Sequence, residues 1–212
     1  MLLHVLVAPY ALRDPSAIAA VIVQALFFLL LTIILVDLAT HRPLMITCII
    51  LVLAASTLRL LSSAIPISLH ALADAALALC GIITLVMAMR WILLARRATP
   101  ALISGAVSIY LLAGITWAIV FHALESLHPG SFSAPGTSAI ADASDLYYFS
   151  FVTLTTLGYG DVNPITAPAR SISVFEAVFG QIFLVVLLGR LVSLQISNGV
   201  SPEKHDSMSP AK

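Results

Sequence analysis

Residues 155–161 read TTLGYGD, and their types and spacing suit the binding of a bare cation by backbone oxygen atoms. Gly158 and Gly160 can adopt the positive φ angles that other residues avoid, alternating with Leu157 and Tyr159. We expect this alternation to turn successive carbonyl groups toward one side of the loop. A row of carbonyls aimed at a common axis can replace the water around a monovalent cation.

The position of this motif in the chain is as informative as its composition. It lies between two segments that are apolar enough to cross a lipid bilayer. Backbone that leaves helical structure at membrane depth exposes N–H and C=O groups that lipid cannot satisfy, so it persists only where protein buries it or water and ions line it. A glycine-containing loop at this place is therefore either a tight turn buried by protein or part of a pathway lined by water and ions.

The overall composition is that of a membrane protein. Hydrophobic residues make up 60% of the chain and charged residues only 9%, which is far outside the range of soluble domains. The formal net charge is zero, so no nucleic-acid partner is indicated, and the lipid bilayer is the expected surrounding. Both cysteines, Cys48 and Cys80, fall within apolar runs and are expected to be buried free thiols.

Five segments are long and apolar enough to cross about 30 Å of hydrocarbon. They cover residues 17–38, 43–61, 69–94, 101–124 and 171–197. A polar loop follows the fourth segment, and Asp142 or Ser144 can cap a short helix that begins near Asp145. This helix, LYYFSFVTLTT, is too short to span the membrane, and the negative end of its dipole would favour a cation beside the motif.

This arrangement resembles the potassium channel family over residues 101–197. In that family an outer helix, a re-entrant pore helix, a filter loop and an inner helix follow one another, and Leu157 replaces the more common valine or isoleucine of the filter. Together with the five apolar segments, the resemblance predicts an all-α membrane protein of five transmembrane helices plus a pore helix. It also implies a homotetramer, because each chain supplies only one strand of the filter. The implied function is passive conduction of K⁺, with no reaction and no cofactor.

The resemblance also assigns roles to the residues of the motif, which we call the filter loop. It implies that ions are bound by the backbone carbonyls of five consecutive residues, with the hydroxyl of the first residue contributing as well. These residues are Thr156, Leu157, Gly158, Tyr159 and Gly160, and the K⁺ sites are expected at the first four of them.

The residues around the filter loop depart from the family pattern. Asp161 would brace the outer end of the loop by hydrogen bonding behind it, the alternative being a solvated loop carboxylate. Where many members have paired tryptophans, this chain has Tyr148, which can reach a polar partner and so could also brace the loop, and Phe149, which has no donor for Tyr159. Val152 stands where some members carry a carboxylate. These differences keep open the alternative of a weakly selective monovalent cation channel.

The segment at 171–197 is the expected inner helix. Gly180 follows Gly158 by 22 residues, a spacing that matches the gating hinge of the family, although glycine in membrane helices also permits close packing. Glu176 is either a functional ionisable group or a residue hydrogen-bonded behind the pore helix. Arg190 is expected to extend to the cytoplasmic interface, with lining of a gate as the alternative.

The first three segments give fewer indications. None of them has an arginine at every third position, so a voltage sensor is not expected. His70 and Asp74 share one helical face, a spacing that suits either a metal or proton site or two interfacial polar residues. A remote alternative is a membrane enzyme or transporter that uses these residues or the cluster around Asp37, although no nucleophile, second carboxylate or cofactor motif accompanies them.

The distribution of charge predicts an orientation and a division into parts. Basic residues gather on the links that would be cytoplasmic if the filter faces outward, so we expect a cell-membrane protein with an outer N-terminus and a cytoplasmic C-terminus. We expect residues 1–100 to form a three-helix bundle, residues 101–197 the pore domain, and residues 198–212 a disordered tail. The regulatory ligand, if there is one, is not indicated by the sequence.

Overall fold

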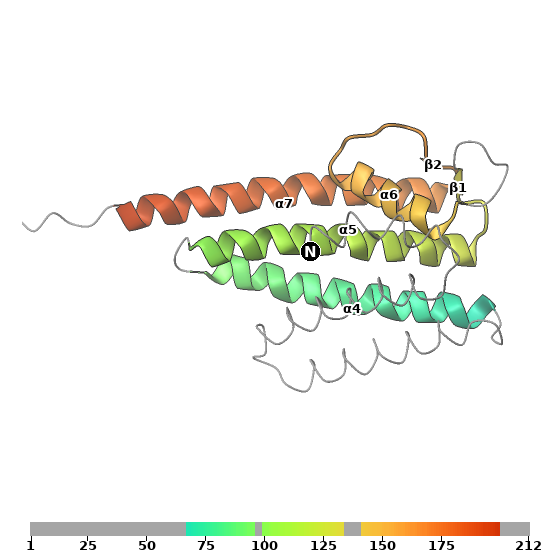
Figure 1. Ribbon diagram of the computed structural model, residues 1–212, viewed down its shortest axis with the longest axis horizontal. Coiled ribbons are helices and arrows are strands. Elements are labelled where there is room, and N and C mark those ends of the chain that lie inside the picture. Colours follow the sequence, from blue (N-terminus) through green and yellow to red (C-terminus); the bar gives the residue numbers. More distant parts are fainter. Residues whose placement is uncertain (1–66, 96–98, 134–140, 200–212) are drawn as a thin grey trace, which may run out of the picture.

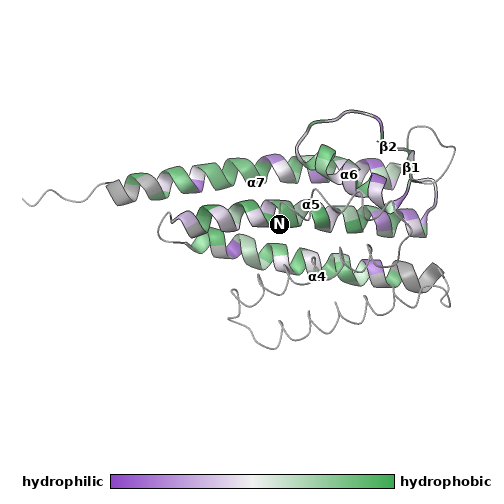
Figure 2. Cartoon of the chain, viewed as in Figure 1, coloured by the Kyte–Doolittle hydropathy of each residue, from purple (hydrophilic) through white to green (hydrophobic). Residues whose placement is uncertain are grey.

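Three long helices lie side by side in the computed structural model, which describes residues 67–95, 99–133 and 141–199 (Figure 1). They are α4 (Ile67–Leu94), α5 (Pro100–Leu127) and α7 (Ala167–Gly199). Each contains a stretch long and apolar enough to cross a membrane, and apolar colouring extends along all three (Figure 2). The third, fourth and fifth predicted spans are thus helices. The first two, at 17–38 and 43–61, lie outside the described residues.

The helix ends differ from the prediction by up to four residues. Thr99 caps α5, since its side chain accepts a hydrogen bond of 3.1 Å from the Leu102 N–H, and Pro100 occupies the first turn. The inner helix α7 begins at Ala167 instead of residue 171, because a proline at position 168 is tolerated in a first turn, where backbone N–H groups have no helical partner.

A short helix, α6 (Ala143–Leu154), lies against α5 and α7 at one end of the bundle (Figure 1). It begins two residues before the predicted start at Asp145. Asp142 is the cap: its Oδ1 accepts hydrogen bonds from the backbone N–H groups of Ser144 at 2.8 Å and Asp145 at 2.9 Å. The Asp145 carboxylate accepts in return from the Asp142 N–H at 3.3 Å. This reciprocal pair fixes where the helix starts.

Two short strands add a small β element to the predicted all-α fold. β1 (Phe132–Ser133) pairs antiparallel with β2 (Asn163–Pro164), so the segment after α5 is bonded to the segment just before α7. The buried Glu125 carboxylate supports this connection by accepting from the N–H groups of Gly130 at 2.7 Å and Phe132 at 3.0 Å. The two ends of the segment that contains α6 and the filter loop are therefore held together.

The three long helices are buried to different degrees. About half of the apolar stretch of α4 (47%) and of α5 (50%) is buried, but only 22% of that of α7. At the α4–α5 contact, a Cβ on Gly81 would lie 2.7 Å from the Thr116 side chain, so the two helices approach closely there. Cys80 is buried, as predicted. Large apolar side chains stay exposed along α7: Val174, Phe175, Val178, Ile182, Val185, Leu188, Val192 and Ile196.

Candidate functional site

The filter loop begins by folding back on the carboxyl end of α6. The Thr156 N–H donates to the Thr153 carbonyl at 2.9 Å, and the Leu157 N–H donates to the Val152 carbonyl at 2.9 Å. The last carbonyls of a helix have no partner within the helix, and they carry the negative end of its dipole. The loop thus uses these carbonyls to fix its own start and stands next to the partial negative charge that favours a cation.

The backbone of the loop alternates in handedness. Gly158 has a φ of 60° and Gly160 a φ of 79°, which confirms the positive values predicted for both glycines. Thr156 has a φ of 57° and is the one non-glycine residue with a positive φ in the described part of the chain. For a β-branched residue this conformation is strained, and such strain is typical of functional segments. Every second residue of the loop is therefore left-handed, as an alternating carbonyl arrangement requires.

The loop is open to the surroundings in the single chain. Residues 155–161 are all exposed, with Tyr159 at 67% and Leu157 at 55%. The described residues hold no group of three or more His, Cys, Asp or Glu side chains that could bind a metal ion. Within this part of the chain, the backbone oxygens of the filter loop are the candidate cation ligands, and one copy of the loop does not enclose a site.

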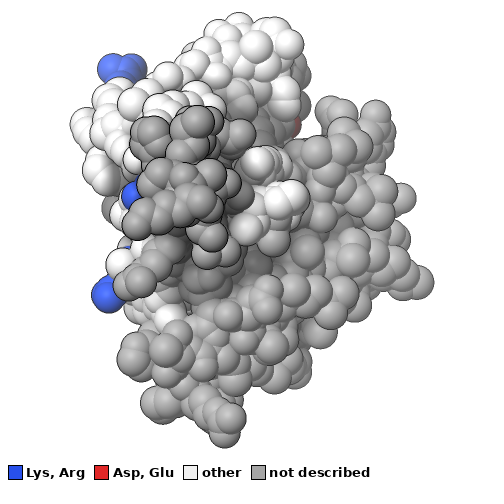
Figure 3. Space-filling view, turned by 90° about the vertical axis from the view of Figure 1, so that its left-hand side faces the viewer, with Lys and Arg blue, Asp and Glu red and all other residues white. Residues whose placement is uncertain are grey.

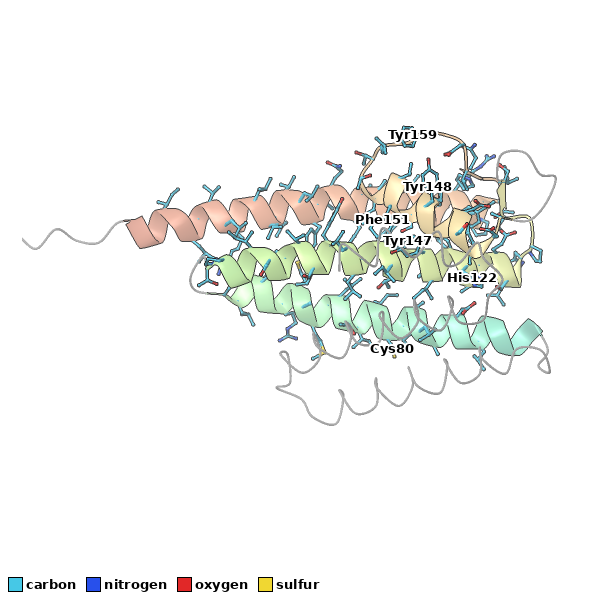
Figure 4. The ribbon with its side chains drawn as sticks, in the orientation of Figure 1. Cys80, His122, Tyr147, Tyr148, Phe151 and Tyr159 are labelled. Atoms are coloured by element: carbon cyan, nitrogen blue, oxygen red, sulfur yellow. The ribbon has the colours of Figure 1, made fainter. Side chains whose placement is uncertain are left out.

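Side chains of three residues hold the far end of the loop. The Tyr148 hydroxyl is hydrogen-bonded to the Asp161 carboxylate, and burial together with this bond raises the pKa of Tyr148 to about 12. Asp161 Oδ1 also accepts from the Val162 N–H at 3.0 Å. The Asn163 side chain donates to the Gly160 carbonyl at 2.6 Å, so this carbonyl already has one partner. Figure 4 shows Tyr148 on α6 beneath Tyr159 of the loop.

A glutamine of the inner helix reaches the near end of the loop. Gln181 Nε2 lies 3.3 Å from Thr156 Oγ1, the hydroxyl expected to serve the innermost ion. Sequence reasoning did not single out Gln181. The available signal was its place directly after Gly180. Where Gly180 brings α7 close to the end of α6, the next residue of α7 also lies near the start of the filter loop.

Three helices meet at the last residue of α6. The Leu154 carbonyl accepts a hydrogen bond of 3.1 Å from the Tyr110 hydroxyl of α5. A Cβ built on Gly180 of α7 would overlap the same carbonyl oxygen. Glycine at position 180 is therefore required for α7 to lie this close to α6, a packing role that stands beside the predicted hinge role.

Glu176 lies behind α6, the expected pore helix. This is one of the two roles predicted for it. Its Oε1 is 2.5 Å from Ser150 Oγ of α6, and both side chains are fully buried. Ser150 Oγ is also 2.8 Å from the Gly114 carbonyl of α5. Gly114 permits this approach, because a Cβ there would lie 2.6 Å from the Phe151 ring.

Three further predictions concern Asp74, Arg190 and the cluster around Asp37. Asp74 is buried, and its Oδ2 lies 2.7 Å from Nδ1 of His122 on α5. The side chain of His70, which was predicted to share a helical face with Asp74, is not among those that the structure describes. Arg190 of α7 donates to the carbonyl of Ala95, the residue that follows α4, at 2.6 Å and so ties α7 to the end of α4. The Asp37 cluster lies outside the described residues.

Phe149 belongs to an aromatic cluster on the α5 side of the pore helix. Its ring packs edge-to-face against Phe121 at 5.2 Å and against Phe132 at 5.3 Å between ring centroids. Its packing thus joins α6 to α5 and β1, whereas the neighbouring Tyr148 is hydrogen-bonded to Asp161 at the filter loop.

Comparison with known proteins agrees with this geometry. Residues 107–196, which contain most of α5, all of α6, the filter loop and most of α7, match a family model described as ion channel. No solved structure matches the chain.

Two curated plant proteins are similar to this chain, and both are potassium channels by name, which supports the predicted resemblance to that family. Over 96 residues it is 38% identical to two pore potassium channel c of Oryza sativa subsp. japonica, covering 44% of this chain and 20% of that protein. Over 66 residues it is 39% identical to two-pore potassium channel 4 of Arabidopsis thaliana, covering 31% of this chain and 22% of that protein. The chain therefore matches about a fifth of the length of these relatives. The matched family model and both relatives are described as channels.

Proposed function

We propose that this chain forms a potassium-selective channel that conducts K⁺ passively across the cell membrane. The observation that carries the proposal is the alternation of positive φ angles at Thr156, Gly158 and Gly160, next to the carboxyl end of α6. The carbonyls of residues 156–159 would form the K⁺ sites, with the Thr156 hydroxyl at the inner end. The Gly160 carbonyl would contribute at the outer end, where Asn163 already donates to it.

We further propose that the working assembly is a homotetramer. A ring of carbonyls around an axis needs several copies of the loop, and closed cyclic symmetry supplies them. The low burial of α7 supports this, because its exposed apolar side chains would be covered by neighbouring copies or would face the pore. Native mass spectrometry of the purified protein checks the assembly, with four copies of the 22.5 kDa chain as the expected particle.

The proposed orientation places the filter loop at the outer surface, with the N-terminus outside and the C-terminus in the cytoplasm. The opposite end of the bundle would then be cytoplasmic. Figure 3, which looks at that end, shows Lys and Arg atoms and almost no acidic surface among the described residues. This distribution is the one that the positive-inside rule favours. Residues 101–197 would be the pore domain and residues 1–100 a peripheral bundle.

Conduction is tested by reconstitution in planar bilayers with unequal K⁺ and Na⁺ on the two sides. We expect a reversal potential close to the K⁺ equilibrium potential. A current that reverses near zero under equal total cation concentrations would instead support the alternative of a weakly selective monovalent cation channel. No cation current at all, from protein shown to be folded and inserted, would rule out both.

A further inference from the structure

Ser150 lies within hydrogen-bonding distance of two oxygen atoms that belong to different helices. These are the Gly114 carbonyl oxygen of α5 and Oε1 of Glu176 on α7. A serine hydroxyl has one hydrogen to donate, and an ionised carboxylate can only accept. With Glu176 ionised, one of the two contacts would therefore join two oxygens with no hydrogen between them. Both contacts are satisfied when the Glu176 carboxyl donates to Ser150 and Ser150 donates to Gly114.

The burial of Glu176 agrees with this hydrogen count. Its side chain is fully buried, and Oε2 has no hydrogen-bond partner within the described part of the chain. An ionised carboxylate with one unpaired oxygen is very costly away from water, whereas the carbonyl oxygen of a neutral acid is much less so. The proton would lie on Oε1, the oxygen that faces Ser150.

We propose that Glu176 is a positioning residue that carries a proton at neutral pH and thereby completes two hydrogen bonds in series, from α7 through α6 to α5. Its effect on conduction rests on the proposed channel function, since Ser150 lies in the helix that ends at the filter loop. The neutral acid holds the pore helix to both long helices at once.

Loss of this proton would break the series at a defined point. When the proton leaves for solvent, the carboxylate becomes a stronger acceptor than the Gly114 carbonyl, so the single hydrogen of Ser150 turns toward Glu176. The contact to α5 then has no hydrogen, and alkaline pH releases the pore helix from that side. The titratable group of α5 that interacts electrostatically with Glu176 is Tyr110, and the group of α6 in contact with it is Ser150.

Glu125 provides a matched control within the same chain. It is also buried, but its two carboxylate oxygens accept from the N–H groups of Gly130 and Phe132. Two backbone donors suit an ionised carboxylate and need no proton on it. The two buried glutamates should thus differ in protonation state for a reason that the geometry supplies.

Infrared spectroscopy of the protein in lipid vesicles tests the protonation state directly. At neutral pH we expect the C=O stretching band of a protonated carboxyl group, with its intensity reduced by one carboxyl group in Glu176→Gln and unchanged in Glu125→Gln. An unchanged band in Glu176→Gln, or no such band in the unmodified protein, would overturn the proposal.

Flux of K⁺ from vesicles at increasing pH tests the positioning role. Glu176→Gln keeps an N–H donor for Ser150 and cannot ionise, so we expect near-normal flux without the several-fold alkaline loss of the unmodified protein. Glu176→Leu and Ser150→Ala should lose flux at every pH, and Tyr110→Phe should keep the alkaline loss. If Glu176→Gln behaved like Glu176→Leu, or kept the alkaline loss, the proposal would be wrong.

The two readouts separate this inference from the proposed function. The infrared band does not depend on conduction, so a chain that failed to select K⁺ could still show the protonated Glu176. Conversely, a selective K⁺ current together with an ionised Glu176 would leave the channel function standing and reject only the inference.

Discussion

Gly180 of α7 lies so close to Leu154 of α6 that the Leu154 carbonyl oxygen occupies the space of a side chain at position 180. The same carbonyl accepts a hydrogen bond from Tyr110 of α5. The last turn of α6 is thus held between α5 and α7, directly before the filter loop.

Replacing Gly180 by alanine should therefore separate α7 from α6. A backbone oxygen cannot rotate away as a side chain can, so we expect destabilisation of about 1–3 kcal/mol and loss of current. Gly189→Ala is the control, because no atom lies within 4 Å of a Cβ there and alanine favours a helix by about 0.5–1 kcal/mol. Thermal unfolding in detergent measures both variants. Unchanged stability of Gly180→Ala with altered opening would instead support a pure hinge.

Replacing Gly158 by alanine should damage the filter loop through backbone strain alone. No atom lies within 4 Å of a Cβ at this position, but the φ of 60° costs an L-residue about 1–2 kcal/mol. We expect loss of K⁺ current or of K⁺ selectivity in planar bilayers. Gly130→Ala is the matched control, since its φ of 86° and open surroundings are similar but it lies in the loop after α5. Equal currents from the two variants would contradict the filter assignment.

Replacing Tyr148 by phenylalanine tests the bracing of the loop by Asp161. The pKa of Tyr148, about 12 against an ordinary 10.0, means that the neutral phenol is favoured in the folded state. Its stabilising contribution is present below the ordinary pKa and is lost as pH rises through 12. We expect Tyr148→Phe to lower stability at neutral pH by about 1 kcal/mol and to remove a late-titrating group from the phenolate absorbance. Asp161→Asn should keep that group but make it titrate earlier.

Replacing Gln181 by methionine tests the contact with Thr156. Methionine keeps the length of the side chain but has no donor for the Thr156 hydroxyl. The contact is exposed and 3.3 Å long, so we expect its loss to cost less than about 1 kcal/mol and to change single-channel K⁺ conductance by at most roughly fivefold. An identical conductance would show that Gln181 does not position Thr156.

Local chemistry made the filter loop predictable from the sequence. The positive φ angles at Gly158 and Gly160 follow from the lack of a Cβ, and Asp142 caps α6 because a carboxylate before a helix satisfies free N–H groups. Helix ends were less well predicted where a tolerated proline or a threonine cap extended them, as at the starts of α7 and α5.

The partners in contacts between helices could not be predicted from the sequence, although a position of Glu176 behind the short helix was one of its two predicted alternatives. Gln181 and Thr156 are 25 residues apart, Glu176 and Ser150 are 26 apart, and Asp74 and His122 are 48 apart. Each pair depends on which faces of two helices meet, and helical periodicity alone does not determine this. Asp74 was predicted to share a helical face with His70, as part of a site or as two interfacial polar residues, whereas its described partner, His122, comes from the neighbouring helix α5.

The exposure of the filter loop in one chain has a genetic consequence under the proposed homotetramer. Each copy would supply one quarter of the carbonyl oxygens at every ion site. A single defective loop would therefore disrupt the ion sites of the whole tetramer. With equal amounts of normal and Gly158-altered chains that mix freely, only roughly one assembly in sixteen would consist of normal copies alone. Defects confined to the filter loop should thus behave as dominant, whereas changes that prevent a chain from joining the ring should behave as recessive.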